Sequence, residues 1–146
     1  MNLNQLMKEN VKEPDYVEYQ PSKRLVDENG EPQTWLLRPL STKEYDKVTA
    51  RHTQKIRNKM GKVVDEYIDN EAVVADLTLE SLVEPSKEDL QQKELQDSWG
   101  VFNPTDLLKA ILNLPGEYAD LLMKVQEIAG FDVFAVEQAR EETEKN

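Results

Sequence analysis

Few side chains in this 146-residue chain could do chemistry. There is no cysteine and a single histidine, His52, so thiolate nucleophiles, cysteine zinc sites and multi-histidine metal sites are excluded. Three carboxylates, Asp65, Glu66 and Asp69, fall within one turn of an expected helix, where they could chelate a hard cation or flank a glycosidic bond. The start of a helix favours acids anyway, because of its dipole, and no calcium-loop spacing accompanies these three. We therefore interpret them as a solvated helix start, and His52 as a packing or surface residue.

Catalytic motifs are also missing from the sequence. It contains no GxxxxGKS/T phosphate loop, no GxGxxG nucleotide fingerprint, no GxSxG nucleophile elbow and no HExxH zinc site. Catalysis needs a nucleophile, a base or a metal whose partners can be identified. We therefore predict a protein that is not an enzyme, with no catalytic residues, no metal ligands and no cofactor.

The net charge points to protein partners. The 18 Lys and Arg against 29 Asp and Glu give a charge of −11, which opposes binding to nucleic acid. The longest unbroken apolar runs are four residues, against about 20 needed to span a bilayer. The first residues also lack the basic start and apolar stretch of a signal peptide. We therefore expect a cytoplasmic protein with no nucleic-acid and no membrane partner.

Strand and turn signals dominate residues 1–40. Residues 24–26 and 34–38 are rich in strand formers, and Asn29-Gly30 between them supplies the positive φ of a tight turn. Prolines interrupt the region, which keeps its strands short. We predict an N-terminal arm and a short β-hairpin over residues 1–40.

A capping box predicts the start of the next element. The Ser41 side chain can accept a hydrogen bond from the Glu44 amide, while the Glu44 carboxylate accepts one from the Ser41 amide. Gly61 is a suitable end. We therefore predict a basic capped helix over residues 41–62.

Charge is unevenly distributed along the chain. Residues 1–62 hold 12 bases and 9 acids, whereas residues 63–146 hold 6 bases and 20 acids. Four bases recur at every fourth position and would share one face of the predicted helix: Lys43, Lys47, Arg51 and Lys55. A solvated helix face is the commonest explanation of such a pattern. The functional alternative is electrostatic docking on an acidic protein surface, including the acidic half of a second copy.

The rest of the chain carries helical signals. Asn103-Pro104 and Pro115 are strong helix starts, and the helix after Pro115 is clearly amphipathic. We predict an acidic helical core over residues 63–132 and a mobile acidic tail over residues 133–146. The fold class is therefore α+β and predominantly α-helical, with a short N-terminal β-hairpin followed by a compact multi-helix core.

Several segments, taken in order, share the pattern of one protein family. They are Trp35-Leu36-Leu37-Arg38-Pro39-Leu40-Ser41 with Glu44, residues 79–85, Leu95-Gln96 with Gly100, residues 107–112, Pro115-Gly116-Glu117-Tyr118 with Leu121, and Gly130-Phe131-Asp132. Together they resemble the XkdN-like tail assembly chaperones of phages and prophages in Gram-positive bacteria. The resemblance runs from about Trp35 to the C-terminus and rests mainly on core leucines.

The resemblance implies a non-enzymatic factor that is absent from the finished virion. Such a factor binds the long tape-measure protein and presents it to tail tube protein subunits. A small helical domain could shield exposed apolar faces of this client in a groove between helices. The residues that we expect to line the groove are Trp99, Phe102, Leu107, Leu108, Ile111, Leu112, Tyr118, Leu121, Leu122 and Val125.

Two other functions stay open on the sequence. The first is a structural tail or head-to-tail component that remains in the particle, with the N-terminal hairpin as an assembly arm. The second is a small regulatory protein-binding domain. The sequence does not separate them from a chaperone, because all three need a surface for protein partners and none needs a catalytic site.

Overall fold

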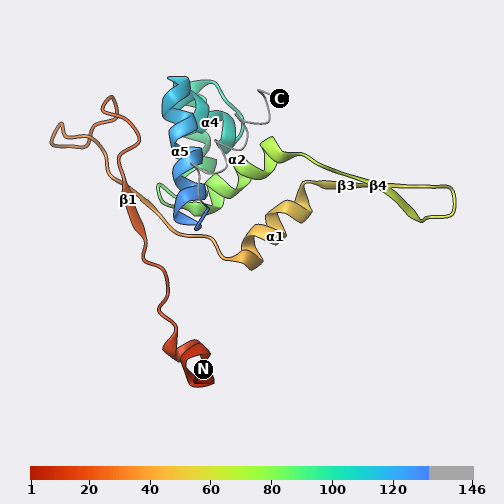
Figure 1. The fold of residues 1–146 in the computed structure, drawn as a ribbon. Helices are drawn as coiled ribbons and strands as arrows, with labels where there is room; N and C mark the ends of the chain where they lie inside the picture. Colours follow the sequence, from red (N-terminus) through yellow and green to blue (C-terminus); the bar gives the residue numbers. More distant parts are fainter. Residues whose placement is uncertain (132–146) are drawn as a thin grey trace, which may run out of the picture.

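Helix α2 (Asn70–Ser81) lies at the centre of the computed structural model, which describes residues 1–131 (Figure 1). Three helices pack against it, α1 (Thr42–Arg51), α4 (Pro104–Ile111) and α5 (Pro115–Ile128). The apolar side chains of α2 are spread around the helix axis, as in a helix surrounded by protein. Most of the tertiary packing is therefore organised around this one helix.

A small antiparallel sheet joins the N-terminal region to the helices. It consists of β1 (Val17–Tyr19), β2 (Trp35–Leu37) and β5 (Leu82–Glu84), in the order β1-β2-β5. A short N-terminal hairpin is present, as predicted, but its strands are β1 and β2, so the predicted pairing of residues 24–26 with residues 34–38 is wrong. The segment around Val26 contributes only a single bridge, to Pro32. Backbone hydrogen bonds flank this bridge, from Gln33 to Leu25 at 2.8 Å and from Asp27 to Glu31 at 2.7 Å, so Pro32 occupies a position that needs no N–H.

Helix α1 begins where the capping box predicts and ends earlier than predicted. The Ser41 and Glu44 side chains each accept from the other's backbone N–H at 3.1 Å. The helix stops at Arg51, and the chain continues as an antiparallel hairpin of β3 (Thr53–Arg57) and β4 (Val63–Ile68). The helix predicted over residues 41–62, and the helical start predicted at residue 63, are therefore wrong.

Strand-forming residues and a tight turn explain why this stretch is a hairpin. Its β-branched and aromatic residues are Thr53, Ile56, Val63, Val64, Tyr67 and Ile68. The Asn58 carboxamide oxygen accepts from the backbone N–H groups of Met60 and Lys62, at 2.9 and 3.0 Å. Gly61 has a φ of 81°, which a residue with a side chain rarely adopts.

The helix starts predicted at Asn103-Pro104 and at Pro115 are confirmed. Helix α3 (Lys93–Trp99) stops at Gly100, which is left-handed with a φ of 67°. The Asn103 side chain accepts from the amide of Asp106 at 2.8 Å and so caps α4, whose first residue is proline. Pro115 likewise opens α5.

Two clusters of buried side chains make up the core. The larger cluster joins the sheet to the helices that follow it, through Trp35, Leu37, Leu79, Leu82, Leu90, Leu107, Leu108, Leu112, Leu121 and Val125. The smaller one fixes α1 on α2, through Val48, Val73 and Leu77. The Tyr19 hydroxyl also donates to Asp120, which fastens the sheet to α5, and the pKa of Tyr19 is raised by burial and by this bond.

The fold is α+β with more helix than strand, as predicted. The tail predicted over residues 133–146 lies outside the described residues. Among residues 1–131, no helix combines the length and the apolar character that crossing a membrane requires.

Candidate docking surface

Half of the side chains predicted to line a groove are core residues. Leu107, Leu108, Leu112, Leu121 and Val125 are all almost fully buried. The reason is that α4 and α5 turn their apolar faces inward, onto α2 and the small sheet. An open groove lined by these five residues does not exist in this structure, and that expectation is corrected.

A hollow beside the core keeps part of the predicted lining. Tyr118 and Leu122 border a space of about 460 Å³ between α2, α4 and α5, together with alanines of α2. The ammonium of Lys109 lies 5.7 Å from the centre of the Tyr118 ring. Burial raises the pKa of Tyr118, and the nearby carboxylates Glu71 and Asp106 raise it further. The lining of the hollow is therefore mixed, since it also includes His52, Asp69, Glu71, Asp76 and Lys109. Ile111 lies outside it and packs against the core.

Trp99 and Phe102 lie apart from this hollow. Trp99 is the last residue of α3 and is 46% exposed, while Phe102 precedes α4 and is 90% exposed. Phe102 is therefore presented to solvent, where a large apolar side chain can anchor a partner. The structure does not bring Trp99 and Phe102 together with Tyr118 and Leu122.

A second apolar pocket lies between α1 and α5. It holds about 120 Å³ and is lined by Leu40, Tyr45, Leu77, Val125, Ala129 and Phe131, with Ser41, Thr42 and Gln126 at its edge. The rings of Tyr45 and Phe131 are 5.6 Å apart and partly close it. The space suits one or two apolar side chains, not a helix.

The predicted line of four bases is divided between two elements. Lys43, Lys47 and Arg51 lie on α1, but Lys55 lies on β3, because the helix ends at Arg51. The Arg51 guanidinium is 3.5 Å from the carboxylate of Asp76 and 3.4 Å from that of Glu80, both on α2. Arg51 therefore stabilises the packing of α1 on α2. A continuous docking face through all four bases is not formed.

His52 is half-buried at the junction of α1 and β3. Its Nε2 lies 2.9 Å from the Asp76 carboxylate, which also contacts Arg51. In the part of the chain that the structure describes, no group of three or more His, Asp or Glu side chains is arranged to hold a metal ion. His52 thus has a packing role in this structure.

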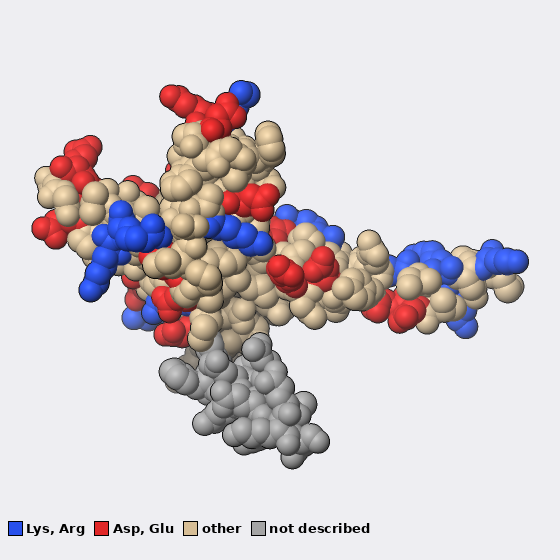
Figure 2. Space-filling model, turned by 90° about the horizontal axis from the view of Figure 1, so that it is seen from above, with Lys and Arg blue, Asp and Glu red and all other residues tan. Residues whose placement is uncertain are grey.

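The β3–β4 hairpin is the largest surface feature that the sequence reasoning missed. It projects away from the helical body (Figure 1), and both of its strands are exposed almost throughout. Four bases lie at or beyond its middle, Lys55, Arg57, Lys59 and Lys62, and Figure 2 shows basic side chains gathered at its outer end. None of the four forms an ion pair with another described residue.

A local signal for the hairpin was present in the sequence. Lys55-Ile56-Arg57 alternates polar and apolar residues, Asn58 and Gly61 suit a turn, and Val63-Val64 begins a second run of strand formers. The bases at every fourth position suggested a helix instead.

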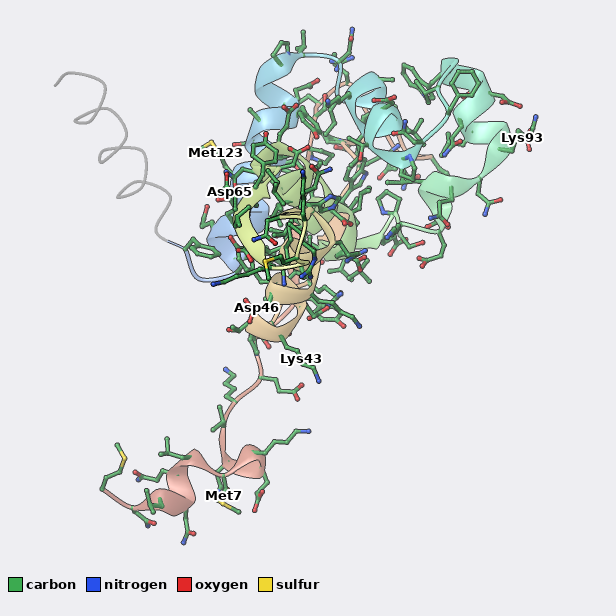
Figure 3. All side chains as sticks on the ribbon, turned by 90° about the vertical axis from the view of Figure 1, so that its right-hand side faces the viewer. Met7, Lys43, Asp46, Asp65, Lys93 and Met123 are labelled. Carbon is green, nitrogen blue, oxygen red and sulfur yellow. The ribbon has the colours of Figure 1, made fainter. Side chains whose placement is uncertain are left out.

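The N-terminal arm is a second projection. Residues 1–16 form short turns and extended chain, and Figure 3 shows Met7 on this arm, well separated from Lys43 at the start of α1. Its large apolar side chains are exposed: Met1, Leu3, Leu6, Met7, Val11 and Tyr16. Uncovered apolar side chains on an extended arm are typical of a segment that contacts a partner.

Comparison with known proteins gives a consistent result. The model of the phage XkdN-like tail assembly chaperone family matches residues 3–144. The phage-like element PBSX protein XkdN of Bacillus subtilis (strain 168) is 31% identical over 111 residues, which are 76% of this chain and 72% of that protein. The protein YqbN of the same strain is 30% identical over 120 residues, 82% of this chain and 78% of that protein. A crystal structure of YqbN superposes with a TM-score of 0.71 at 26% identity, covering 90% of this chain and 98% of that one.

Proposed function

Because the chain belongs to the phage XkdN-like tail assembly chaperones, we propose that it binds the tape-measure protein and promotes assembly of the tail tube. In this role it works by binding alone and catalyses no reaction. Its site of action is the cytoplasm of the bacterial host, and its partners are the tape-measure protein, the tail tube protein and, through its uneven charge, a second copy of itself.

The family match over residues 3–144 is the observation that carries this proposal. The surface supports it, because a chaperone needs apolar side chains that a client can reach. Such side chains are present at Phe102, in the hollow beside Tyr118, on the N-terminal arm and on the β3–β4 hairpin. The buried leucines of α4 and α5 are available only for folding.

Co-expression with the tape-measure protein of the same prophage tests the proposal. We expect the chaperone to raise the soluble yield of the tape-measure protein and to be captured with it. Phe102→Ser should reduce capture, since its side chain is exposed, without changing the circular dichroism spectrum. Leu114→Ser is the matched control, an exposed apolar residue between α4 and α5. Equal soluble yield with and without the chaperone, and no capture, would contradict the proposal.

The N-terminal arm favours a second candidate function. Its uncovered apolar residues would also suit a structural tail component that docks on its neighbour in the particle. Mass spectrometry of purified virions separates the two. A chaperone should be absent from the virion, whereas a tail component should be present in ring-like multiples.

A further inference from the structure

The β3–β4 hairpin exposes apolar side chains that no described part of the chain covers. Ile56 is 53% exposed, Val64 is 60% exposed and Tyr67 is 62% exposed. The register places Gln54 opposite Tyr67 and Ile56 opposite Asp65, so Ile56 and Tyr67 are diagonal neighbours on one face of the ribbon. This face therefore carries an apolar patch of Ile56 and Tyr67 that is open to solvent, while Val64 lies on the other face of the ribbon.

The hairpin also lacks the support that strands normally have. Within residues 1–131 it is a two-stranded sheet, so each strand has one unpaired edge, and neither strand belongs to either core cluster. A two-stranded hairpin is marginally stable alone in water. Contact with a partner would stabilise it.

The charge of the hairpin limits what that partner can be. Residues 53–62 contain four bases and no acid. Lys55 faces Glu66 across the ladder, and Arg57 donates to the Gly61 carbonyl at 2.9 Å, while Lys59 and Lys62 extend toward the tip. Strand β3 is about 17 Å long at ~3.4 Å per residue, which exceeds the Debye length of about 8 Å at physiological salt. Salt therefore screens the tip from the acids of the helical body, while Asp65 and Glu66 on β4 leave the hairpin as a whole with a net charge of +2.

We propose that the β3–β4 hairpin binds an acidic, amphipathic segment of the client chain. The carboxylates of this segment would pair with the bases of the hairpin, and its apolar side chains would cover Ile56 and Tyr67. The inference rests on the proposed function, because it takes the tape-measure protein as the client.

This occupant fits better than two others. A nucleic acid would satisfy the bases, but it would leave the apolar patch without an apolar partner, and Tyr67 is the only aromatic residue of the ribbon that could stack on a base. A second copy could bring the acids of its C-terminal half to the hairpin, but the net charge of −11 on each copy opposes this contact at long range. An acidic, amphipathic segment of a long client supplies both the carboxylates that the bases need and the apolar side chains that the patch needs.

Two sets of charge reversals test the proposal. The hairpin variant carries Lys55→Glu, Lys59→Glu and Lys62→Glu. Its control carries Lys23→Glu, Lys43→Glu and Lys93→Glu, which change the net charge equally at exposed sites outside the hairpin and the N-terminal arm. Overlapping recombinant fragments of the tape-measure protein are the probe, and their dissociation constants are measured after nuclease treatment. Near-UV circular dichroism of the buried Trp35 reports that the helical body of each variant is folded. Amide hydrogen exchange of residues 53–68 reports that the hairpin is formed.

We expect the binding fragment to be rich in acids, and the hairpin variant to bind it roughly tenfold more weakly or worse, since three ion pairs are replaced by repulsion. The control should bind within about twofold of the wild type, because these exposed sites lie outside the contact. Ile56→Thr with Tyr67→Thr, which keeps strand-forming residues, should also weaken binding.

Other outcomes separate the two proposals. If no fragment binds the wild-type protein, the proposed function fails and the hairpin inference fails with it. If a fragment binds, and the hairpin variant and the control bind it equally, only the hairpin inference is overturned. It is also overturned if nuclease removes the binding, or if sedimentation velocity shows that the hairpin variant has lost only self-association.

Discussion

Leu121 lies on the buried face of α5, where no part of its side chain is exposed and where it belongs to the main core cluster. Leu114, seven residues earlier, is 54% exposed between α4 and α5. We expect Leu121→Ala to lower the free energy of unfolding by about 2–5 kcal/mol, because the change removes buried methyl groups and leaves a cavity. Urea unfolding measures this.

Leu114→Ala is the control for the same chemical change, and it should shift the unfolding free energy by less than about 0.5 kcal/mol. Equal effects of the two variants would show that the burial of α5 in solution differs from that described. Leu121 therefore belongs in a test of folding, and a client-binding experiment should use exposed residues instead.

Glu44 links the N-terminal region to α1 electrostatically. Its carboxylate accepts two hydrogen bonds from the Arg38 guanidinium, at 3.1 and 2.6 Å, and one from the Ser41 amide. The bond from Arg38 is the main cause that lowers the pKa of Glu44 to about 2. A carboxyl with a lower pKa in the folded than in the unfolded chain stabilises the fold above its unfolded pKa.

This stabilisation should be lost as the pH falls from about 4.5, the ordinary pKa of the group, to about 2. We expect Glu44→Gln to be less stable than the wild type near neutral pH and to lose less stability across that interval. Urea unfolding at several pH values measures the difference. Glu94→Gln is the control, since Glu94 is exposed on α3 and bonds to no other described side chain. A parallel pH dependence of the wild type and Glu44→Gln would contradict the role of the ion pair.

At the scale of elements, the structure separates what local sequence can predict from what it cannot. The Ser41–Glu44 box, the Asn103 cap and the Gly100 end depend on contacts within a few residues, and all three are present. The β3–β4 hairpin was missed because bases at every fourth position imitate a helix face. The groove was predicted wrongly for a different reason. Periodicity shows that Leu107 and Leu121 each lie on the apolar face of a helix, but it does not show which other element covers that face.

The hairpin should be dispensable for folding of the body. Its two ends meet at Thr53 and Ile68, and the Asp69 amide donates to the His52 carbonyl at 3.0 Å. A short Gly-Ser link in place of residues 53–68 should therefore leave the near-UV spectrum of Trp35 and the thermal midpoint almost unchanged. Binding of the acidic client segment should be lost. A large fall in the midpoint would show that the hairpin supports the core.

At the scale of the whole molecule, the ionic and the apolar contributions to client binding respond differently to salt. The chain has a charge of −11, yet its hairpin tip is basic and lies far from most of its acids. Exposed ion pairs weaken as salt screens them, whereas apolar contacts do not. The salt dependence of client binding therefore reports which contact dominates.

We expect the affinity for the client fragment to fall as salt rises from about 0.05 to 0.5 M. Over this range the Debye length shortens, so salt weakens the attraction between the lysines of the hairpin and the carboxylates of the client. The variant with Lys55→Glu, Lys59→Glu and Lys62→Glu should show a flat or reversed dependence, since its hairpin no longer attracts acids. The apolar variant, Ile56→Thr with Tyr67→Thr, should keep the wild-type slope at a lower affinity. Titration calorimetry across this salt series measures all three. A wild-type affinity that does not change with salt would show that apolar contacts, such as those of Phe102 and the hollow beside Tyr118, dominate client binding. The bases of the hairpin would then serve to prevent aggregation of its exposed strands.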